Sequence, residues 1–235
     1  MAIVISTNAP KPFAASVTVT DGHERDSLEQ EIVALLYTPD FLDLKKGEQI
    51  QLWIEDSKST DAELIKSSGF EPYRDLLQLR CTLPVHQSTL QTRKFEDGLD
   101  DEAFLAVNGR AFTWHPEQGG LNKAGFEKLK EETWFNLDGF LLYEIDDQLA
   151  GFCWTKIHKE SSPTLGEIYA IAIDPAFHGN GLGKPMTEAG LNYLSSIGIE
   201  TGMLYVESDN APALHIYKEI GFSHFLTNRA FRYCV

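Results

Sequence analysis

The sequence predicts an α/β fold in which helices flank a mixed β-sheet. Segments with apolar residues at every second position alternate along the chain with segments whose apolar residues recur at helical spacing. A Gly-rich turn joins one such strand to one such helix at residues 178–184. The 235 residues are 43% hydrophobic and include 18 Gly and 10 Pro, so we expect a packed core in one large domain or two modest ones.

An internal similarity organises the chain. The stretch LWIEDSKSTDAELIKSSGF at 52–70 aligns without a gap to LYVESDNAPALHIYKEIGF at 204–222. Each copy has the pattern of a short strand, a polar turn, an amphipathic helix ended by Gly, and an aromatic residue that enters the next strand. The sequence therefore predicts a repeat, with chance similarity of one strand–helix unit as the alternative.

The two copies differ at positions that can carry chemistry. The second copy has Asn210 in the turn and Tyr217 in the helix, where the first has Lys58 and Ile65. The apolar packing of the helix is kept in the first copy, but the amide and the hydroxyl are gone. We therefore interpret the first copy as a degenerate duplicate.

The domain boundary is predicted near residues 83–89, where Pro84, His86 and their polar neighbours interrupt a strand pattern. We expect a shortened, degenerate half over 1–85 and a complete domain over 86–235, which is a normal domain length. Acidic residues at the start of a segment with helical spacing predict a helix, and a turn between two alternating segments predicts a hairpin. In chain order the elements of this domain are helices at 99–112 and 123–135, a hairpin turning at Asp146-Asp147, a strand at 167–173, a helix at 186–198, and the strand and helix of the second copy followed by a last strand.

Composition restricts the partners and the compartment. The net charge of −15 opposes the phosphate attraction on which nucleic-acid and anionic-membrane binding depend, so neither partner is expected. No segment approaches 20 consecutive apolar residues, and MAIVISTNAPKPFAAS does not resemble a signal peptide, so we predict a cytoplasmic protein. Cys81, Cys153 and Cys234 lie far apart, which predicts buried free thiols and neither a disulfide framework nor a metal site.

The turn HGNGLGK at 178–184 is suited to an anion. A strand, a Gly-rich turn and a helix in succession direct backbone N–H groups and the positive end of a helix at one point. A dinucleotide-binding G-x-G-x-x-G would need Gly or Ala at position 184, where this sequence has Lys184. A P-loop would need Gly at position 178 and Ser or Thr at position 185, where it has His178 and Pro185, so both nucleotide-binding motifs are disfavoured. A plain strand-to-helix turn is the remaining alternative to a phosphate-binding loop.

This turn follows a strand that ends in Ile-Asp-Pro and precedes a helix with Asn210 and Tyr217, and the whole pattern resembles the GNAT superfamily of acetyl-CoA-dependent N-acetyltransferases. In that superfamily the loop amides hold the pyrophosphate of coenzyme A, although Gln or Arg usually stands where this sequence has His178 and often Arg where it has Asn180. The resemblance implies acetyl-CoA as cosubstrate and a GNAT-type sheet. It also implies cofactor-binding positions at Ile171, Ala172, Ile173, His178, Gly179, Asn180, Gly181, Leu182, Gly183, Lys184, Asn210, Ala211, Pro212, Ala213, Leu214 and His215.

Four longer motifs narrow the resemblance to the mycothiol synthase family. They are FLAVNGRAFTWHPEQGG at 104–120, GFCWTKIH at 151–158, GEIYAIAIDP at 166–175 and LYVESDN at 204–210. The resemblance implies acetylation of the cysteinyl amine of 1D-myo-inositol 2-(L-cysteinylamino)-2-deoxy-glucopyranoside, a cysteinyl glucosaminyl-inositol, in the last step of mycothiol biosynthesis. It implies contacts with this small-molecule substrate through Glu117, Lys156, Glu167 and Tyr205. We also expect a monomer.

Two of the residues are predicted to be catalytic. Glu167, at the start of the strand 167–173, is the candidate general base for the acceptor amine. Period-two geometry puts it on the same face as Ile171 and Ile173 unless a bulge intervenes. Tyr217, which the resemblance makes the general acid for the departing thiolate, lies two helical turns after Asn210, so both should face one groove.

Two other functions remain open on the sequence alone. One is a different GNAT enzyme that acts on protein N-termini or another small amine. The other is an acetyl-CoA-binding regulator without turnover, suggested by the altered loop side chains and the shortened first half.

Overall fold

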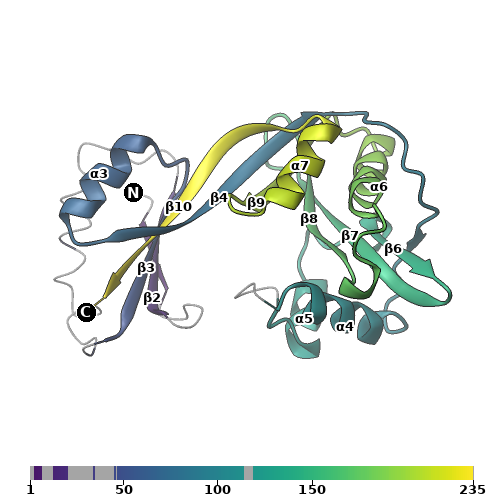
Figure 1. The fold of residues 1–235 in the computed structure, drawn as a ribbon, viewed down its shortest axis with the longest axis horizontal. Helices are drawn as coiled ribbons and strands as arrows, with labels where there is room; N and C mark the ends of the chain where they lie inside the picture. Colours follow the sequence, from purple (N-terminus) through teal and green to yellow (C-terminus); the bar gives the residue numbers. More distant parts are fainter. Residues whose placement is uncertain are drawn as a thin grey trace. The chain divides into compact units, whose positions relative to one another are not determined.

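The computed structural model describes residues 3–6, 13–20, 34, 45, 47–113 and 119–234 (Figure 1). The chain divides into two compact units. Unit 1 is 1–78, 207–209 and 225–235, and unit 2 is 79–206 and 210–224. Two long strands, β4 (Glu71–Thr82) and β10 (Ser223–Cys234), contribute residues to both units. The division into 1–85 and 86–235 made from the sequence stays a prediction.

Unit 1 contains a mixed sheet covered by one described helix. β1 (Ile3–Ser6) pairs antiparallel with β2 (Phe13–Val19), β2 pairs parallel with β3 (Gln49–Ile54), and β3 pairs antiparallel with β10. The helix is α3 (Ser59–Ser67). Its Ile65 is fully buried in an apolar cluster that also contains Ala15, Val17, Val19, Ile50, Leu52, Ile54, Phe70 and Phe231.

Unit 2 is built on a sheet in the order β4-β9-β8-β7-β6-β5. Its strands are β5 (Arg93–Lys94), β6 (Phe140–Ile145), β7 (Gln148–His158), β8 (Leu165–Ile173) and β9 (Thr201–Glu207). The predicted hairpin is confirmed: β6 pairs antiparallel with β7, and Asp146 and Asp147 both have positive φ, as a tight two-residue hairpin turn requires. β8 is antiparallel to β7 and parallel to β9, so the predicted mixed sheet is confirmed.

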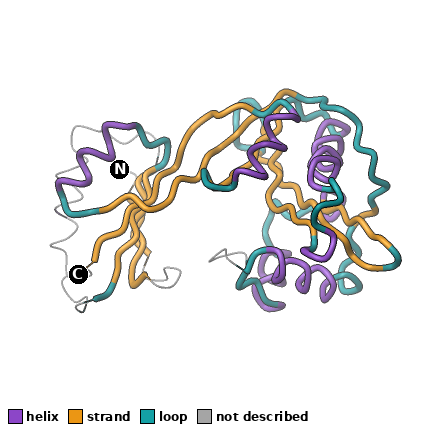
Figure 2. The backbone as a smooth tube through the Cα atoms, viewed as in Figure 1, coloured by secondary structure: helices purple, strands orange, loops and turns teal. Residues whose placement is uncertain are grey.

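Helices cover both faces of this sheet (Figure 2). α4 (Asp101–Ala111) and α5 (Lys123–Lys130) pack on the face that bears the aromatic side chains of β7, whereas the short turn η1 (Leu137–Gly139) contacts α6. α6 (Gly183–Ser196) packs on the opposite face, next to α7 (Ala211–Ile220). Each predicted helix of the domain is present at or close to its expected position.

The helix expected over 123–135 ends five residues early, at Lys130. Trp134 and Phe135 leave the helix and pack their rings against Trp154, with centroid separations of 5.6 and 5.5 Å. Aromatic burial in the core therefore overrides the helical spacing of the sequence. The buried rings of this cluster include Phe95, Phe104, Phe126, Phe140, Phe152 and Trp154.

Close packing on the other face depends on a glycine of α6. A Cβ atom at Gly190 would lie 2.3 Å from the sulfur of Cys153 and 2.8 Å from Cδ1 of Ile168. The helix backbone therefore lies directly on β7 and β8. Burial raises the pKa of Cys153 to about 12, so this thiol stays neutral.

The cysteine prediction holds for two of the three residues. Cys81 and Cys153 are buried free thiols, whereas Cys234 is exposed. The alternating pattern of β10 turns Cys234 outward near the end of the strand. In the part of the chain that the structure describes, no group of three or more His, Cys, Asp or Glu side chains is placed to hold a metal ion, and no helix is long and apolar enough to span a membrane.

Candidate active site

The central strands of unit 2 separate partway along their length. β8 pairs with β9 only from Gly166 to Ile168, opposite Gly202 to Leu204, although both strands continue. The register with β7 shifts at the same level, because Trp154 and Thr155 are opposite Ala170 and Ile168, which leaves Tyr169 as the extra residue of a bulge. Beyond this bulge, β8 has no pairing with β9 in the described residues, and a gap opens in the sheet.

A cavity of about 700 Å³ lies in unit 2 at this level. It is bounded by the end of β8, the Gly-rich loop, the first turns of α6 and one face of α7. Residues of the C-terminal end of α4 close another side. Its lining comprises Ala111, Phe112, Ile171, Ala172, Ile173, Phe177, His178, Gly179, Gly181, Leu182, Gly183, Lys184, Thr187, Asn210, Pro212, Ala213, Ile216, Tyr217 and Glu219.

The Gly-rich loop presents backbone donors to this cavity. Gly179 and Gly181 have φ of +83° and +70°, which side chains with a Cβ rarely adopt. Leu182 precedes α6 and provides no side-chain cap, and in the described residues no acceptor takes a hydrogen bond from the amides of 179–183. Unpaired amides at the positive end of a helix form a site for a phosphate group, so the loop fits the pyrophosphate of acetyl-CoA.

Two polar side chains of the loop bind the backbone that leads into it. The carbonyl of Ile173 accepts a hydrogen bond from Nε2 of His178 at 2.9 Å, and the carbonyl of Phe177 accepts one from the Asn180 amide at 3.1 Å. These residues stand where the superfamily often has longer basic or amide side chains. Their bonds brace the backbone, so anion binding here depends on the amides of the loop.

An ion pair that sequence reasoning missed anchors the start of the loop. Asp174 accepts a hydrogen bond from the amide of Ala176 at 3.0 Å, which caps the short turn η2 (Pro175–Phe177), and it pairs with Arg110 of α4. The hydrogen bond from Arg110 lowers the pKa of Asp174, so the carboxylate stays ionised. The residues are far apart in the chain, and no local pattern links them.

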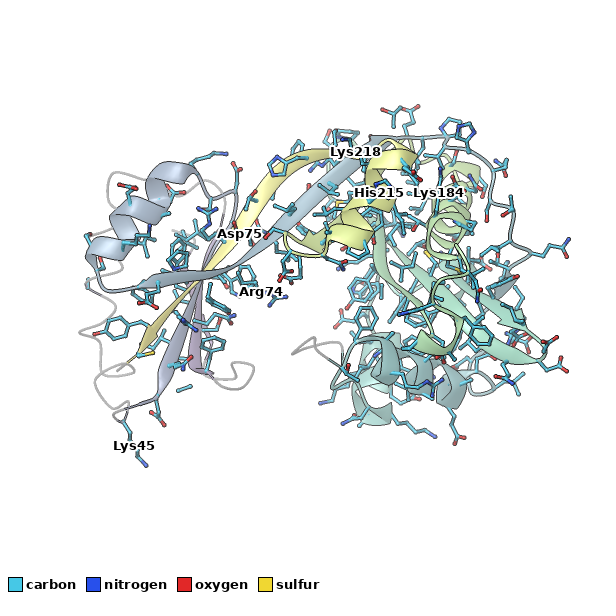
Figure 3. The ribbon with its side chains drawn as sticks, in the orientation of Figure 1. Lys45, Arg74, Asp75, Lys184, His215 and Lys218 are labelled. Carbon is cyan, nitrogen blue, oxygen red and sulfur yellow. The ribbon has the colours of Figure 1, made fainter. Side chains whose placement is uncertain are left out.

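The cofactor-binding positions predicted on α7 fall on two sides of the helix. Asn210, Pro212 and Ala213 line the cavity, whereas Ala211, Leu214 and His215 do not. Figure 3 shows His215 and Lys218 on α7 and Lys184 at the start of α6. The helical repeat explains the split, because Ile216 and Tyr217 continue the lining face. Asn180 is also outside the lining, and the binding roles of all these residues stay predictions.

Tyr217 reaches the cavity from the buried face of α7. The residue is 8% exposed, and its ring packs against Phe222 with a centroid separation of 5.7 Å. Burial, with a smaller effect of the Cys153 thiol, raises the pKa of the phenol above its usual value near 10. The phenol therefore stays protonated at neutral pH and is able to donate a proton. Asn210 lines the same cavity, as expected from the spacing.

Glu167 lies on the opposite face of the sheet from the one expected. It is opposite Lys156 on β7, whereas Ile171 is opposite Cys153, three positions away. The bulge at Tyr169 shifts the alternation by one residue, so Glu167 does not share a face with Ile171 and Ile173. The period-two expectation was wrong for this reason.

Of the predicted substrate contacts, Lys156 lies opposite Glu167 in the sheet. The ammonium of Lys156 lies 4.6 Å from the ring centre of Trp134 and 5.6 Å from that of Tyr169, two aromatic residues that sequence reasoning did not single out. Tyr205 on β9 is 38% exposed. Glu117 lies outside the described residues, as does His115.

Comparison with known proteins identifies the family. Residues 109–222 match the Acetyltransferase (GNAT) family. The chain is 34% identical to the mycothiol acetyltransferase of Kocuria rhizophila, over 98% of this chain and 78% of the relative, and 36% identical to that of Streptomyces coelicolor, over 96% and 73%. It is 40% identical to that of Streptomyces griseus, where the match covers 75% of this chain and 59% of the relative.

Solved structures agree on the fold. A GCN5-related N-acetyltransferase from Sphaerobacter thermophilus superposes with a TM-score of 0.75 at 17% identity, covering 92% of this chain and 72% of that one. A tandem GNAT protein from the clavulanic acid pathway gives 0.60 at 13% identity, covering 96% and 75%. The family match and the relatives thus define an acyltransferase of the GNAT type, and the solved structures share its fold. Within that superfamily, the chain belongs to the mycothiol acetyltransferase family.

Proposed function

We propose that this protein is an acetyl-CoA-dependent N-acetyltransferase that acetylates the cysteinyl amine of the glucosaminyl-inositol precursor in the last step of mycothiol biosynthesis. The relatives at 34–40% identity, all named mycothiol acetyltransferase, support this acceptor. The observation that carries the proposal is the cavity bounded by the Gly-rich loop, the uncapped start of α6 and Tyr217. The proposal includes a monomeric, cytoplasmic enzyme without nucleic-acid, membrane or metal partners.

Acetyl-CoA would occupy the cavity and supply the acetyl group as a thioester. The amides of 179–183 would hold its pyrophosphate. The edge of β8 at 171–173, which lacks pairing with β9 in the described residues, offers strand-like hydrogen bonds to the pantetheine arm. An amide of this edge would also polarise the thioester oxygen.

The gap between β8 and β9 would allow the two substrates to meet. The cavity and Tyr217 lie on the α6 and α7 side of the sheet, whereas Glu167 and Lys156 lie on the side of the aromatic cluster. The acceptor would approach from the Glu167 side and the thioester from the other, with the gap as the meeting point. The bulge that shifted Glu167 is therefore consistent with its proposed role.

Each proton transfer has a candidate residue. Glu167 would take a proton from the acceptor ammonium, through a water molecule if needed, which leaves the amine neutral for attack. Tyr217 would donate its proton to the departing sulfur. Lys156, Tyr205 and Glu117 would hydrogen-bond the sugar and inositol hydroxyls.

The test is a comparison of acceptors. The purified chain is assayed with acetyl-CoA and either the cysteinyl glucosaminyl-inositol or a panel of peptides with free N-termini. We expect turnover on the cysteinyl sugar that exceeds turnover on every peptide. Turnover mainly on peptides would replace the proposal with a protein N-terminal acetyltransferase, and coenzyme A binding without transfer to any acceptor would indicate a regulator.

A further inference from the structure

The ends of β7 and β8 bring His158 and Glu167 into contact. Glu167 is opposite Lys156 in register, and His158 is two positions further along β7, so the three side chains share one face. Nε2 of His158 lies 2.7 Å from Oε2 of Glu167. An ionised carboxylate only accepts hydrogen bonds, so the imidazole N–H is the donor.

The two side chains differ in exposure. The Glu167 side chain is 9% exposed and that of His158 is 29% exposed. A buried carboxylate requires a hydrogen-bond donor, and among the described residues His158 is the donor that the structure provides. The ammonium of Lys156 is directed to the Trp134 and Tyr169 rings instead, and the β9 partner of Glu167 is the apolar Met203.

The two oxygens of the Glu167 carboxylate thus differ in their hydrogen bonding. Oε2 accepts from His158, whereas Oε1 has no hydrogen-bond partner within the described residues. In many enzymes a third group orients the general base. That group fixes the reactive atom of the base and does not touch the substrate. His158 is placed to do this for Glu167.

We propose that His158 is a positioning residue that holds the Glu167 carboxylate so that Oε1 faces the acceptor amine. This inference rests on the proposed function, since it assigns the orientation of the proposed general base. It concerns the acceptor side of the sheet and leaves the acetyl-CoA cavity unaffected. It therefore predicts a loss of kcat with an unchanged KM for acetyl-CoA.

A double-mutant cycle tests whether His158 acts through Glu167. His158→Ala should lower kcat about tenfold in the wild-type background and have no further effect in the Glu167→Gln background, because coupled residues are non-additive. Thermal stability is measured for all four proteins. Independent, additive losses, or wild-type kinetics for His158→Ala, would overturn the proposal.

Two further variants separate positioning from a general effect of substitution. His158→Gln retains an N–H donor near the same place, so it should recover part of the activity that His158→Ala loses. His224→Gln alters an exposed histidine of β10 and should leave kcat unchanged. A His158→Gln variant no better than His158→Ala, or an equal loss in His224→Gln, would contradict the assignment.

A spectroscopic readout keeps the two proposals separate. The imidazole ¹⁵N signal of His158 should change when Glu167 is replaced by Gln, whether or not the protein turns over any amine. If the wild-type protein acetylates no acceptor but the signal changes, the proposed function fails and the contact stands. If the signal does not change, the contact is absent and the positioning role is excluded.

Discussion

At the scale of single residues, the site depends on what each side chain contacts. Tyr217 is buried, with its phenol held in the protonated form, and Glu167 is fixed by its neighbour on β7. His178 and Asn180 bond to the carbonyls of Ile173 and Phe177, just before the loop. With these side chains engaged by carbonyls, the proposed anion site would rely on the backbone amides of 179–183.

Replacing Tyr217 by Phe separates a packing role from an acid role. The ring and its contact with Phe222 remain, so the thermal stability should fall by no more than about 1 kcal/mol, the usual contribution of one hydrogen bond. If the phenol protonates the departing thiolate, kcat should fall about 10²-fold while acetyl-CoA still binds. Unchanged turnover across pH 6 to 9 would make Tyr217 a core residue only.

The raised pKa of Tyr217 also bears on the pH dependence expected if this phenol is the proton donor. A phenol whose pKa lies above 10 in the folded protein remains protonated at every pH below that value. The wild-type kcat should therefore show no decline caused by loss of this proton up to pH 9. A kcat that falls with an apparent pKa near 8 would point to a different proton donor.

At the scale of elements, two helices of unit 2 begin with the same kind of side-chain cap. The Asn210 side chain accepts a hydrogen bond from the amide of Ala213 at 3.2 Å at the start of α7, and Asn122 accepts one from Gly125 at 2.9 Å at the start of α5. Only Asn210 lines the cavity beside the Gly-rich loop. The two caps thus provide a matched pair.

Asn210→Ala and Asn122→Ala should each cost about 1 kcal/mol of unfolding free energy, because each removes an N-cap. Asn210→Ala should in addition weaken acetyl-CoA binding, measured by calorimetry, whereas Asn122→Ala should not. Equal affinities in the two variants would restrict Asn210 to capping.

Helix packing gives a second matched pair. An alanine at Gly190 of α6 must displace Cys153 and Ile168, so Gly190→Ala should destabilise the fold by about 1–3 kcal/mol. A Cβ at Gly109 of α4 meets no atom within 4 Å, so Gly109→Ala should stabilise it by up to about 1 kcal/mol through helix propensity. Denaturant unfolding measures both, and a stable Gly190→Ala variant would show that α6 is free to move away from the sheet.

The sequence anticipated elements whose signals are local. The Asp146-Asp147 turn between alternating segments and the glycines at 179 and 181 carried enough information to place the hairpin and the loop. Interactions across the fold left no local signal, so the contact between His158 and Glu167 and the pair of Arg110 with Asp174 were not foreseen. The bulge at Tyr169 reversed the face of Glu167 for the same reason, because strand register is fixed by the neighbouring strands.

At the scale of the whole molecule, the two strand–helix copies have different surroundings. Ile65, at the position equivalent to Tyr217, is fully buried in the apolar cluster of unit 1. Lys58 stands at the start of α3, where α7 begins with Asn210. We therefore expect one acetyl-CoA per chain, bound in unit 2. Calorimetric titration that gives two equivalents would show that unit 1 retains a site.

The strand β10 belongs to the core of unit 1 but is the last strand of the chain to be synthesised. Residues 229–234 pair with β3, and Phe231 completes the core beside Ile50 and Leu52, although they are synthesised only after all of unit 2. Domains commonly fold as units from the N-terminus during translation, but unit 1 lacks one of its strands at that stage. During translation, the whole sequence of unit 2 is therefore available before β10 is complete. Until residues 229–234 have been synthesised, β3 lacks its β10 partner.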